Sequence, residues 1–293
     1  MKKLHVMFTM DCEARNDIAT EGGPPDWAFC RRSMEGYTDL LLQHGYRPTL
    51  FVVPQTAQAH SAALLELKNK GAELGLHLHP QDFGYADYLG GYSYEEQVAM
   101  LDRVTQDWAD ALGFRPESFR GGNFSGNDAT APALSHLGYK QGSLSVPGRN
   151  FTRVKSNWAG AEMWPHHMHK ANRLLAGDMN FLEVPATADW ESVMWGGLTK
   201  LELRIEMVDA RAHGFTIRKS VERQREEGIE EPYLCALTHN IFDYTDLGEF
   251  RRQVLEGVLQ EISACADQQE LAVHGCTLQE YHTWFHATKS AQA

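Results

Sequence analysis

The sequence has no long hydrophobic run, few cysteines and a shortage of positive charge. Without a stretch of about eighteen apolar residues, its 293 residues should contain no transmembrane helix. The basic N-terminus lacks the apolar segment of a signal peptide. Five cysteines with no close pairs predict reduced thiols and not a disulfide framework. A net charge of −12 argues against nucleic-acid binding. Because the thiols are expected to be reduced and no signal peptide is recognised, we expect a cytoplasmic protein.

The composition is that of a packed globular protein. Hydrophobic residues make up 43% of the chain and charged residues 23%, which excludes extensive disorder. No repeat, low-complexity segment or linker interrupts the sequence. We therefore expect one domain spanning residues 1–293, a length common among α/β barrels.

Short apolar runs alternate with amphipathic segments, several of which end at a glycine. This order favours parallel βαβ units and an α/β fold. Residues 145–180 are predicted to be a long loop, and the alternation over 201–207 favours a strand over a helix. The expected strands are 4–10, 49–53, 73–77, 118–120, 181–186, 234–237 and 270–273, and the expected helices are 27–44, 57–70, 93–112, 129–137, 249–266 and 278–285.

Titratable side chains gather where these strands end. In parallel α/β folds the carboxyl ends of the strands form one face, and active sites lie there. The side chains concerned are Asp11 and Glu13 after the first strand, His77 and His79 after the third, Arg120 after the fourth and His239 after a late strand. We expect them to converge on one site.

His77 and His79 are two residues apart, so both imidazoles lie on one face of an extended backbone. With one added carboxylate they supply three ligands and leave room for water, as in a hydrolytic zinc site. The same ligand set occurs in non-haem iron oxygenases, but those usually have all-β folds. A polar cap on a loop is the simplest alternative.

Six segments, in order, resemble motifs of the polysaccharide deacetylases, the NodB-homology group of carbohydrate esterase family 4. They are residues 8–13, 48–53, 70–77, 119–124, 237–239 and 275–280. The resemblance implies a distorted (β/α) barrel of about seven parallel strands. It also implies a metal-dependent hydrolase that removes an acetyl group from an N-acetylated sugar, polysaccharide or glycoconjugate.

Two departures from the family pattern affect the assignment of roles. The family has adjacent aspartates, whereas here Cys12 separates Asp11 from Glu13. Alternation along the strand puts the two carboxylates on one side, so Asp11 is expected to be the base and Glu13 a metal ligand, although these roles could be exchanged. The family's second histidine would fall at Gln81, and His79 replaces it. These changes suggest a divergent branch, one that could serve cell-surface polysaccharide synthesis.

The resemblance also assigns the remaining roles. Arg120 is expected to hold Asp11 ionised, and the backbone N–H near Asn123 to bind the oxyanion. His239 would protonate the leaving amine. The carboxylate that tunes this histidine would be Asp189 or Glu183.

The expected metal is zinc, with cobalt, nickel, manganese or iron as alternatives. A second hypothesis keeps the chemistry but replaces the sugar with a small amide such as a ureide or cyclic imide. A third is a barrel that binds glycans without turning them over. The sequence leaves the oligomeric state open.

Overall fold

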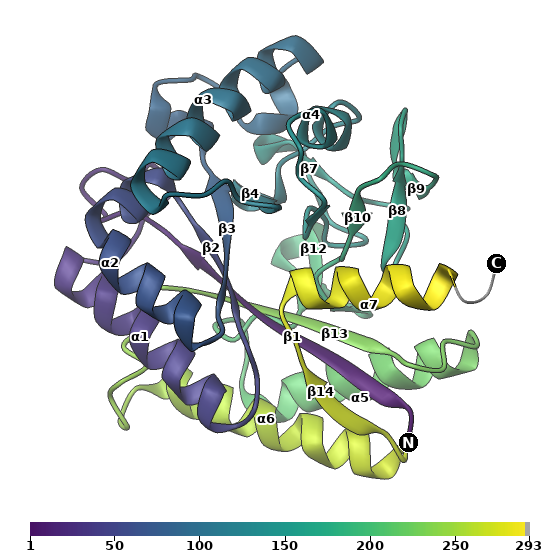
Figure 1. Cartoon of the computed structure of the whole chain (residues 1–293). Coiled ribbons are helices and arrows are strands. Elements are labelled where there is room, and N and C mark those ends of the chain that lie inside the picture. The colour runs from purple at the N-terminus through teal and green to yellow at the C-terminus, as the bar shows by residue number, and fades with distance from the viewer. Residues whose placement is uncertain (291–293) are drawn as a thin grey trace.

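A mostly parallel β-sheet, curled into a half-barrel, forms the frame of the computed structural model, which describes residues 1–290 (Figure 1). Its order is β13-β1-β2-β3-β4-β5-β10-β8-β9, and β14 also pairs with β1. The strands are β1 (Lys3–Cys12), β2 (Thr49–Val52), β3 (Glu73–Leu78), β4 (Ser118–Gly121), β5 (Gln141–Gly142), β8 (His166–His169), β9 (Asn172–Ala176), β10 (Leu182–Glu183), β13 (Tyr233–His239) and β14 (Ala272–Gly275). The first strands pair in parallel, which confirms the expected α/β barrel.

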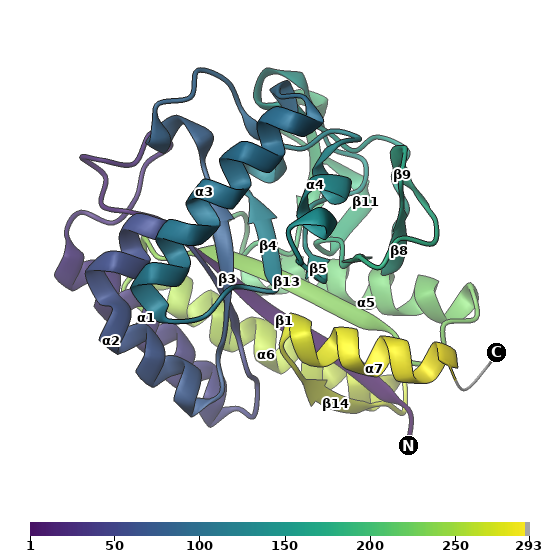
Figure 2. The ribbon, with the colours of Figure 1, turned by 45° about the horizontal axis from the view of Figure 1, so that its top comes forward.

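Helices cover the outside of the curled sheet. Helices α1, α2 and α3 lie in contact along one side, and α5 and α6 pack together along another (Figures 1 and 2). A capping box at Ser93 fixes the start of α3. The helices are α1 (Trp27–Gln43), α2 (Pro54–Lys70), α3 (Tyr94–Leu112), α4 (Thr130–His136), α5 (Ala210–Glu226), α6 (Phe250–Gln268) and α7 (Leu278–Ser290). None of the helices in the described part of the chain has the length and apolar character needed to cross a bilayer.

Strand β1 separates the barrel interior from the helical layer. Phe8, Met10 and Cys12 belong to the large apolar cluster shared with the helices, whereas Met7 packs in a second cluster with Phe51 of β2. Side chains alternate between the two faces of a strand, so residues at odd positions of β1 share the inner side with Met7. Asp11 is thereby directed into the barrel.

An extended segment, residues 203–205, closes the barrel beside β13. The N–H of Leu237 donates to the carbonyl of Leu203, and the N–H of Ile205 donates to the carbonyl of Leu237, each at 3.0 Å. This segment follows the hairpin of β11 (Ala188–Met194) and β12 (Thr199–Glu202). The pairing carries the chain past the end of β13, next to the expected site.

Helix α7 begins at the opposite end of the barrel, where the strands start. The N–H of Leu278 donates to Thr49 Oγ1 at 3.0 Å, and the N–H of Gln279 donates to Glu73 Oε2 at 3.0 Å. Thr49 and Glu73 are the first residues of β2 and β3. The helix therefore covers the amino ends of the strands and leaves their carboxyl ends open.

The prediction of a long loop over residues 145–180 is wrong. This region contains β6 (Asn150–Phe151), β7 (Ser156–Asn157), β8 and β9, and β8 extends the main sheet by antiparallel pairing with β10. The pairs are short, so their side-chain alternation spans too few residues to be recognised in the sequence. The last strand also lies later than expected, at Ala272–Gly275 instead of 270–273.

Candidate active site

Glu13, His77 and His79 meet at the carboxyl ends of β1 and β3. Glu13 Oε1 lies 3.1 Å from Nε2 of His77 and 3.1 Å from Nε2 of His79. All three side chains are buried, and their ligand atoms lie within 4.8 Å of one another. The His-x-His spacing on a strand end does bring both imidazoles to one carboxylate.

The orientation of His77 is fixed by the neighbouring strand. Its Nδ1 lies 2.9 Å from the backbone carbonyl oxygen of Arg120. A carbonyl only accepts, so Nδ1 carries a proton, and in the neutral ring Nε2 presents a lone pair toward Glu13. Metal-binding histidines commonly donate their other N–H to a carbonyl in this way.

The three residues fit a divalent transition metal. When His77 is neutral, two acceptors, its Nε2 and the carboxylate of Glu13, face each other at 3.1 Å, which requires a cation or a proton between them. A buried carboxylate with two imidazoles is a donor set that zinc accepts. His79 Nδ1 has no hydrogen-bond partner among the described residues.

Glu13 and the two histidines stabilise one another's charged forms. Burial acts to raise the pKa of Glu13, but His79 and His77 bring that pKa well below its usual range. Burial acts to lower the pKa of His79, but Glu13 raises it to about 9. The site therefore strongly favours a negative carboxylate with positive charge beside it.

Asp11 occupies a different position from Glu13. Its Oδ1 accepts a hydrogen bond from Arg120 Nη1 at 2.8 Å. Its Oδ2 lies 3.9 Å from Nε2 of both His77 and His239. Burial acts to raise the pKa of Asp11, but the charge of Arg120, followed by those of the two histidines, holds it below the usual value.

Arg120 is fully buried inside the barrel. Besides Asp11, its Nη1 donates to Thr9 Oγ1 at 2.9 Å, and its guanidinium lies over the rings of Phe51 and Phe124 at 4.5 and 5.2 Å. These contacts leave the guanidinium little freedom to turn away. The expected pairing of Arg120 with Asp11 is thus present in the structure.

His239, at the end of β13, pairs with Glu206. Its Nδ1 hydrogen-bonds Glu206 Oε1, so its Nε2 faces Asp11. Burial acts to lower the pKa of His239, but Glu206 raises it above the usual value. Sequence reasoning missed Glu206. The alternation over 201–207 marked Glu206 as a polar position, but nothing in it indicated that this segment pairs with β13.

Neither carboxylate expected to tune His239 does so. Asp189 accepts hydrogen bonds from Ser192 and Lys219. Glu183 accepts the backbone N–H groups of Leu144 and Ser145 inside the barrel. Both expectations are wrong because the segment carrying Glu206, and not β10 or β11, runs beside the end of β13.

Asn123 lies at the turn after β4 with a φ of 56°. Its backbone carbonyl accepts a hydrogen bond from Arg149 Nη1 at 3.0 Å, which fixes the peptide that joins it to Phe124. Its side-chain nitrogen is buried without a hydrogen-bond partner among the described residues. Asn123 therefore offers polar groups to the same site.

The expected site residues, except the fully buried Arg120, line one cavity of about 490 Å³. That volume lies within the range of small-molecule sites. Arg204, Glu21 and Ile241 contribute to its walls beyond the residues expected from the sequence. The complete lining is Asp11, Glu13, Glu21, Gly22, Gly23, His77, His79, Asn123, Phe124, Arg204, Glu206, His239 and Ile241.

Comparison with known proteins agrees with this architecture. Residues 22–142 match the family model described as polysaccharide deacetylase. This range includes His77, His79, Arg120 and Asn123, but not Asp11, Glu13 or His239. Comparison with curated proteins finds no significant match.

Solved structures share the fold over nearly the whole chain. A protein from Mycobacterium smegmatis assigned as a polysaccharide deacetylase is 18% identical, with a TM-score of 0.62, over 98% of this chain and 92% of that chain. The PuuE allantoinase is 14% identical, with a TM-score of 0.61, over 98% and 91% of the two chains. Residues 22–142 thus resemble the polysaccharide deacetylase family, and the whole chain shares the barrel fold of these solved structures.

Proposed function

We propose that this protein is a metal-dependent hydrolase that removes the acetyl group from an N-acetylated sugar or glycoconjugate, with residues 1–293 acting as one catalytic domain. One observation carries the proposal. Glu13 contacts the two imidazoles of His77 and His79, while Asp11 is held by Arg120 and approaches His239. The two carboxylates are therefore suited to separate roles.

Glu13, His77 and His79 would hold the metal. We propose zinc, which accepts this set of nitrogen and oxygen donors, with cobalt, nickel, manganese and iron as alternatives. A bound divalent ion would polarise the acetyl carbonyl and lower the pKa of a water molecule. The remaining chemistry belongs to side chains of the chain itself.

Asp11 is the proposed general base. It would accept a proton from the attacking water, and Arg120 keeps its carboxylate ionised and oriented for this step. The fully buried guanidinium of Arg120 also limits rotation of that carboxylate. The second carboxylate, Glu13, has no comparable contact with arginine among the described residues.

His239 is the proposed general acid. Glu206 favours its protonated form, so the imidazolium can donate a proton from Nε2 to the departing nitrogen. The same Nε2 lies 3.9 Å from Asp11 Oδ2, so both groups are placed to act on one substrate amide that lies beside them. Asn123 and the adjacent backbone N–H groups are proposed donors to the oxyanion.

An exposed aromatic residue supports a sugar as substrate. Trp195 is 48% exposed, and the guanidinium of Arg204, a cavity residue, lies 6.0 Å from its ring centre. Sugar rings commonly pack on such exposed aromatic faces because their C–H groups are apolar. A cytoplasmic location is part of the proposal, supported by the five unpaired cysteines.

The test measures the metal content of each variant and its activity on two substrates. Activity is followed as acetate release from N-acetylglucosamine oligomers and as ammonia or acid release from a ureide. Asp11→Asn should retain the metal and lose about 10²–10⁴-fold in rate, because the ligands remain and the base is lost. His77→Ala combined with His79→Ala should lose both metal and activity. His44→Ala, which changes an exposed histidine after α1, is the control and should alter neither.

Two results would overturn the assignment. Unchanged metal content in the double histidine variant would remove the ligand set. Loss of the metal from Asp11→Asn would instead make Asp11 a ligand and Glu13 the candidate base. If the protein hydrolyses the ureide and releases no acetate, its substrate is a small amide and not a sugar. The proposed roles of the site residues would then still hold.

A further inference from the structure

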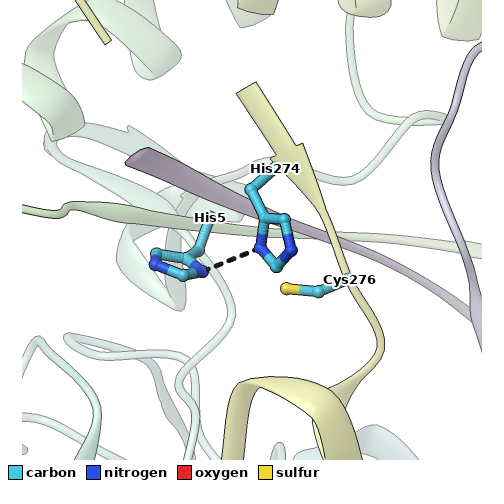
Figure 3. A group of neighbouring side chains, drawn as sticks. All are labelled: His5, His274 and Cys276. Carbon is cyan, nitrogen blue, oxygen red and sulfur yellow. Dashed lines mark hydrogen bonds between the residues drawn. The ribbon is translucent and has the colours of Figure 1, made fainter. Parts of the chain in front are cut away.

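A second cluster of metal-ligating side chains lies at the other end of β1. His5 in β1, His274 in β14 and Cys276 just after β14 place their ligand atoms within 4.8 Å of one another. Figure 3 shows the two imidazoles facing each other, with the sulfur of Cys276 directed toward them. His5 and Cys276 are fully buried, and His274 is half-buried.

The strand pairing itself brings these residues together. His5 and His274 are direct partners in the parallel register of β1 and β14. Cys276 follows His274 by two residues, the spacing that returns a side chain to the same face of an extended chain. The cluster is therefore held by backbone hydrogen bonds and not by the side chains alone.

The distance between the two histidines suits a shared ion. Nδ1 of His5 and Nδ1 of His274 lie 3.2 Å apart. Two imidazoles bound tetrahedrally to zinc at about 2.0–2.1 Å have nitrogens about 3.3 Å apart. The rings thus already have the separation that a common metal requires.

The carboxylate of Glu231 sets the tautomer of His5. Nε2 of His5 lies 3.4 Å from Glu231 Oε2, and the backbone N–H of Lys3 donates to the other oxygen of Glu231 at 3.0 Å. A carboxylate accepts, so Nε2 carries the proton and the lone pair is on Nδ1, facing His274. This carboxylate–histidine arrangement is common behind metal-ligating imidazoles.

We propose that His5, His274 and Cys276 form a second metal site, one that binds Zn²⁺ through two nitrogens and a thiolate. Sulfur and imidazole ligands together favour zinc over magnesium or calcium. Binding would release the thiol proton of Cys276 to solvent. The fourth position can be taken by water, because His274 is only half-buried and solvent reaches this side of the cluster.

This site is separate from the candidate active site. His5 precedes Asp11 by six residues on the same strand, a separation of roughly 20 Å at about 3.3 Å per residue. It lies at the amino ends of the strands, the face of a barrel that serves stability and not catalysis. Its ion would join the first strand of the chain to the last strand and to helix α7.

The sulfur ligand gives a specific experiment. All three proposed ligands of the active site offer nitrogen or oxygen, so a thiolate-to-cobalt charge-transfer band in Co²⁺-loaded full-length protein would report the second site alone. The native protein should bind two cobalt equivalents and show this near-ultraviolet band. Cys276→Ser should abolish the band and reduce the bound cobalt from two equivalents to one. His274→Ala should have the same effect.

Cys235→Ala is the matched control, because Cys235 is another buried cysteine of the same apolar cluster. It should keep the band and both equivalents. Glu13→Gln should weaken only the other site and leave the band unchanged. Absence of a thiolate band from fully loaded native protein, or a band that survives Cys276→Ser, would overturn the proposal whether or not the variants fold well.

Discussion

Glu206 illustrates how one carboxylate can set the chemistry of a neighbouring imidazole. Without it, the burial of His239 would favour the neutral ring, which cannot act as an acid. The hydrogen bond from His239 Nδ1 to Glu206 reverses that preference and also directs Nε2 toward Asp11. Glu206 is thus a positioning and tuning residue in the proposed mechanism.

Glu206→Gln should lower the pKa of His239 and reduce the turnover rate by about 10–100-fold at neutral pH. The acid must be protonated to act, so the alkaline limb of the pH–rate profile should move to lower pH. The measurement is kcat against pH on folded, metal-loaded enzyme.

Asp189→Asn is the matched control, since Asp189 is a buried carboxylate that contacts Lys219 and not His239. Its alkaline limb should stay in place. An unmoved limb in Glu206→Gln itself would show that the proton donor is some other group.

The residues around the site could be predicted from the sequence to different extents. Asp11, Glu13, His77, His79, Arg120 and His239 all follow buried apolar runs, and a parallel sheet brings such positions together. Glu206 follows a segment joined to β13 by an isolated pairing, which no local pattern specifies. Its partner could therefore be assigned only from the three-dimensional structure.

At the scale of elements, β10 carries a buried carboxylate with no role in the proposed chemistry. Glu183 accepts hydrogen bonds from two successive backbone N–H groups and from the hydroxyl of Ser145. Burial raises its pKa from 4.5 to about 7 despite these bonds. The folded protein therefore holds a proton that the unfolded chain releases at lower pH.

This difference predicts a pH-dependent loss of stability. Between about pH 4.5 and 7 the folded state binds more protons than the unfolded state, so the contribution of Glu183 falls by up to about 3 kcal/mol as the pH rises. Glu183→Gln cannot ionise and should reduce that slope. Urea unfolding at about pH 5 and about pH 8 measures it.

Glu226→Gln changes an exposed glutamate at the end of α5 and should leave the slope of the native protein unchanged. A Glu183→Gln variant with the native slope would contradict the prediction. In that case Glu183 would ionise near the ordinary value.

Most of the long helices were predictable from the sequence, although α5 was not among the expected helices. The helices α1, α3 and α6 have apolar faces and clear ends, and each lies within a few residues of its expected range. Strands β8 and β9 were missed because they are short and β8 pairs at the edge of the main sheet with β10, which lies beyond β9 in the sequence. Local patterns carry little information about such pairings.

At the scale of the whole molecule, bound metal should contribute to stability. An ion that binds only the folded state at about 1,000 times its Kd adds about 4 kcal/mol, which corresponds to roughly 10 °C in the unfolding temperature. Removal of metal with a chelator should lower that temperature, and added zinc should restore it. Differential scanning calorimetry measures the change.

Variants at each proposed metal site show how much of the metal-dependent rise in unfolding temperature comes from each end of the barrel. His77→Ala with His79→Ala should retain only the part due to the second site, and Cys276→Ser only the part due to the first. A chelator-dependent shift that persists with all three substitutions would place the stabilising ion elsewhere.

The pairing of β1 with β2, β13 and β14 also affects how the chain folds during synthesis. His5 pairs with Tyr233 and His274, partners more than 220 residues away. At about 5–20 residues per second, a ribosome needs roughly 10–50 seconds to make the chain between His5 and Tyr233. The first strand to emerge is therefore among the last to be fully paired. Its apolar faces therefore stay incompletely covered until these later strands are made, which makes β1 a candidate chaperone-binding segment of the nascent protein.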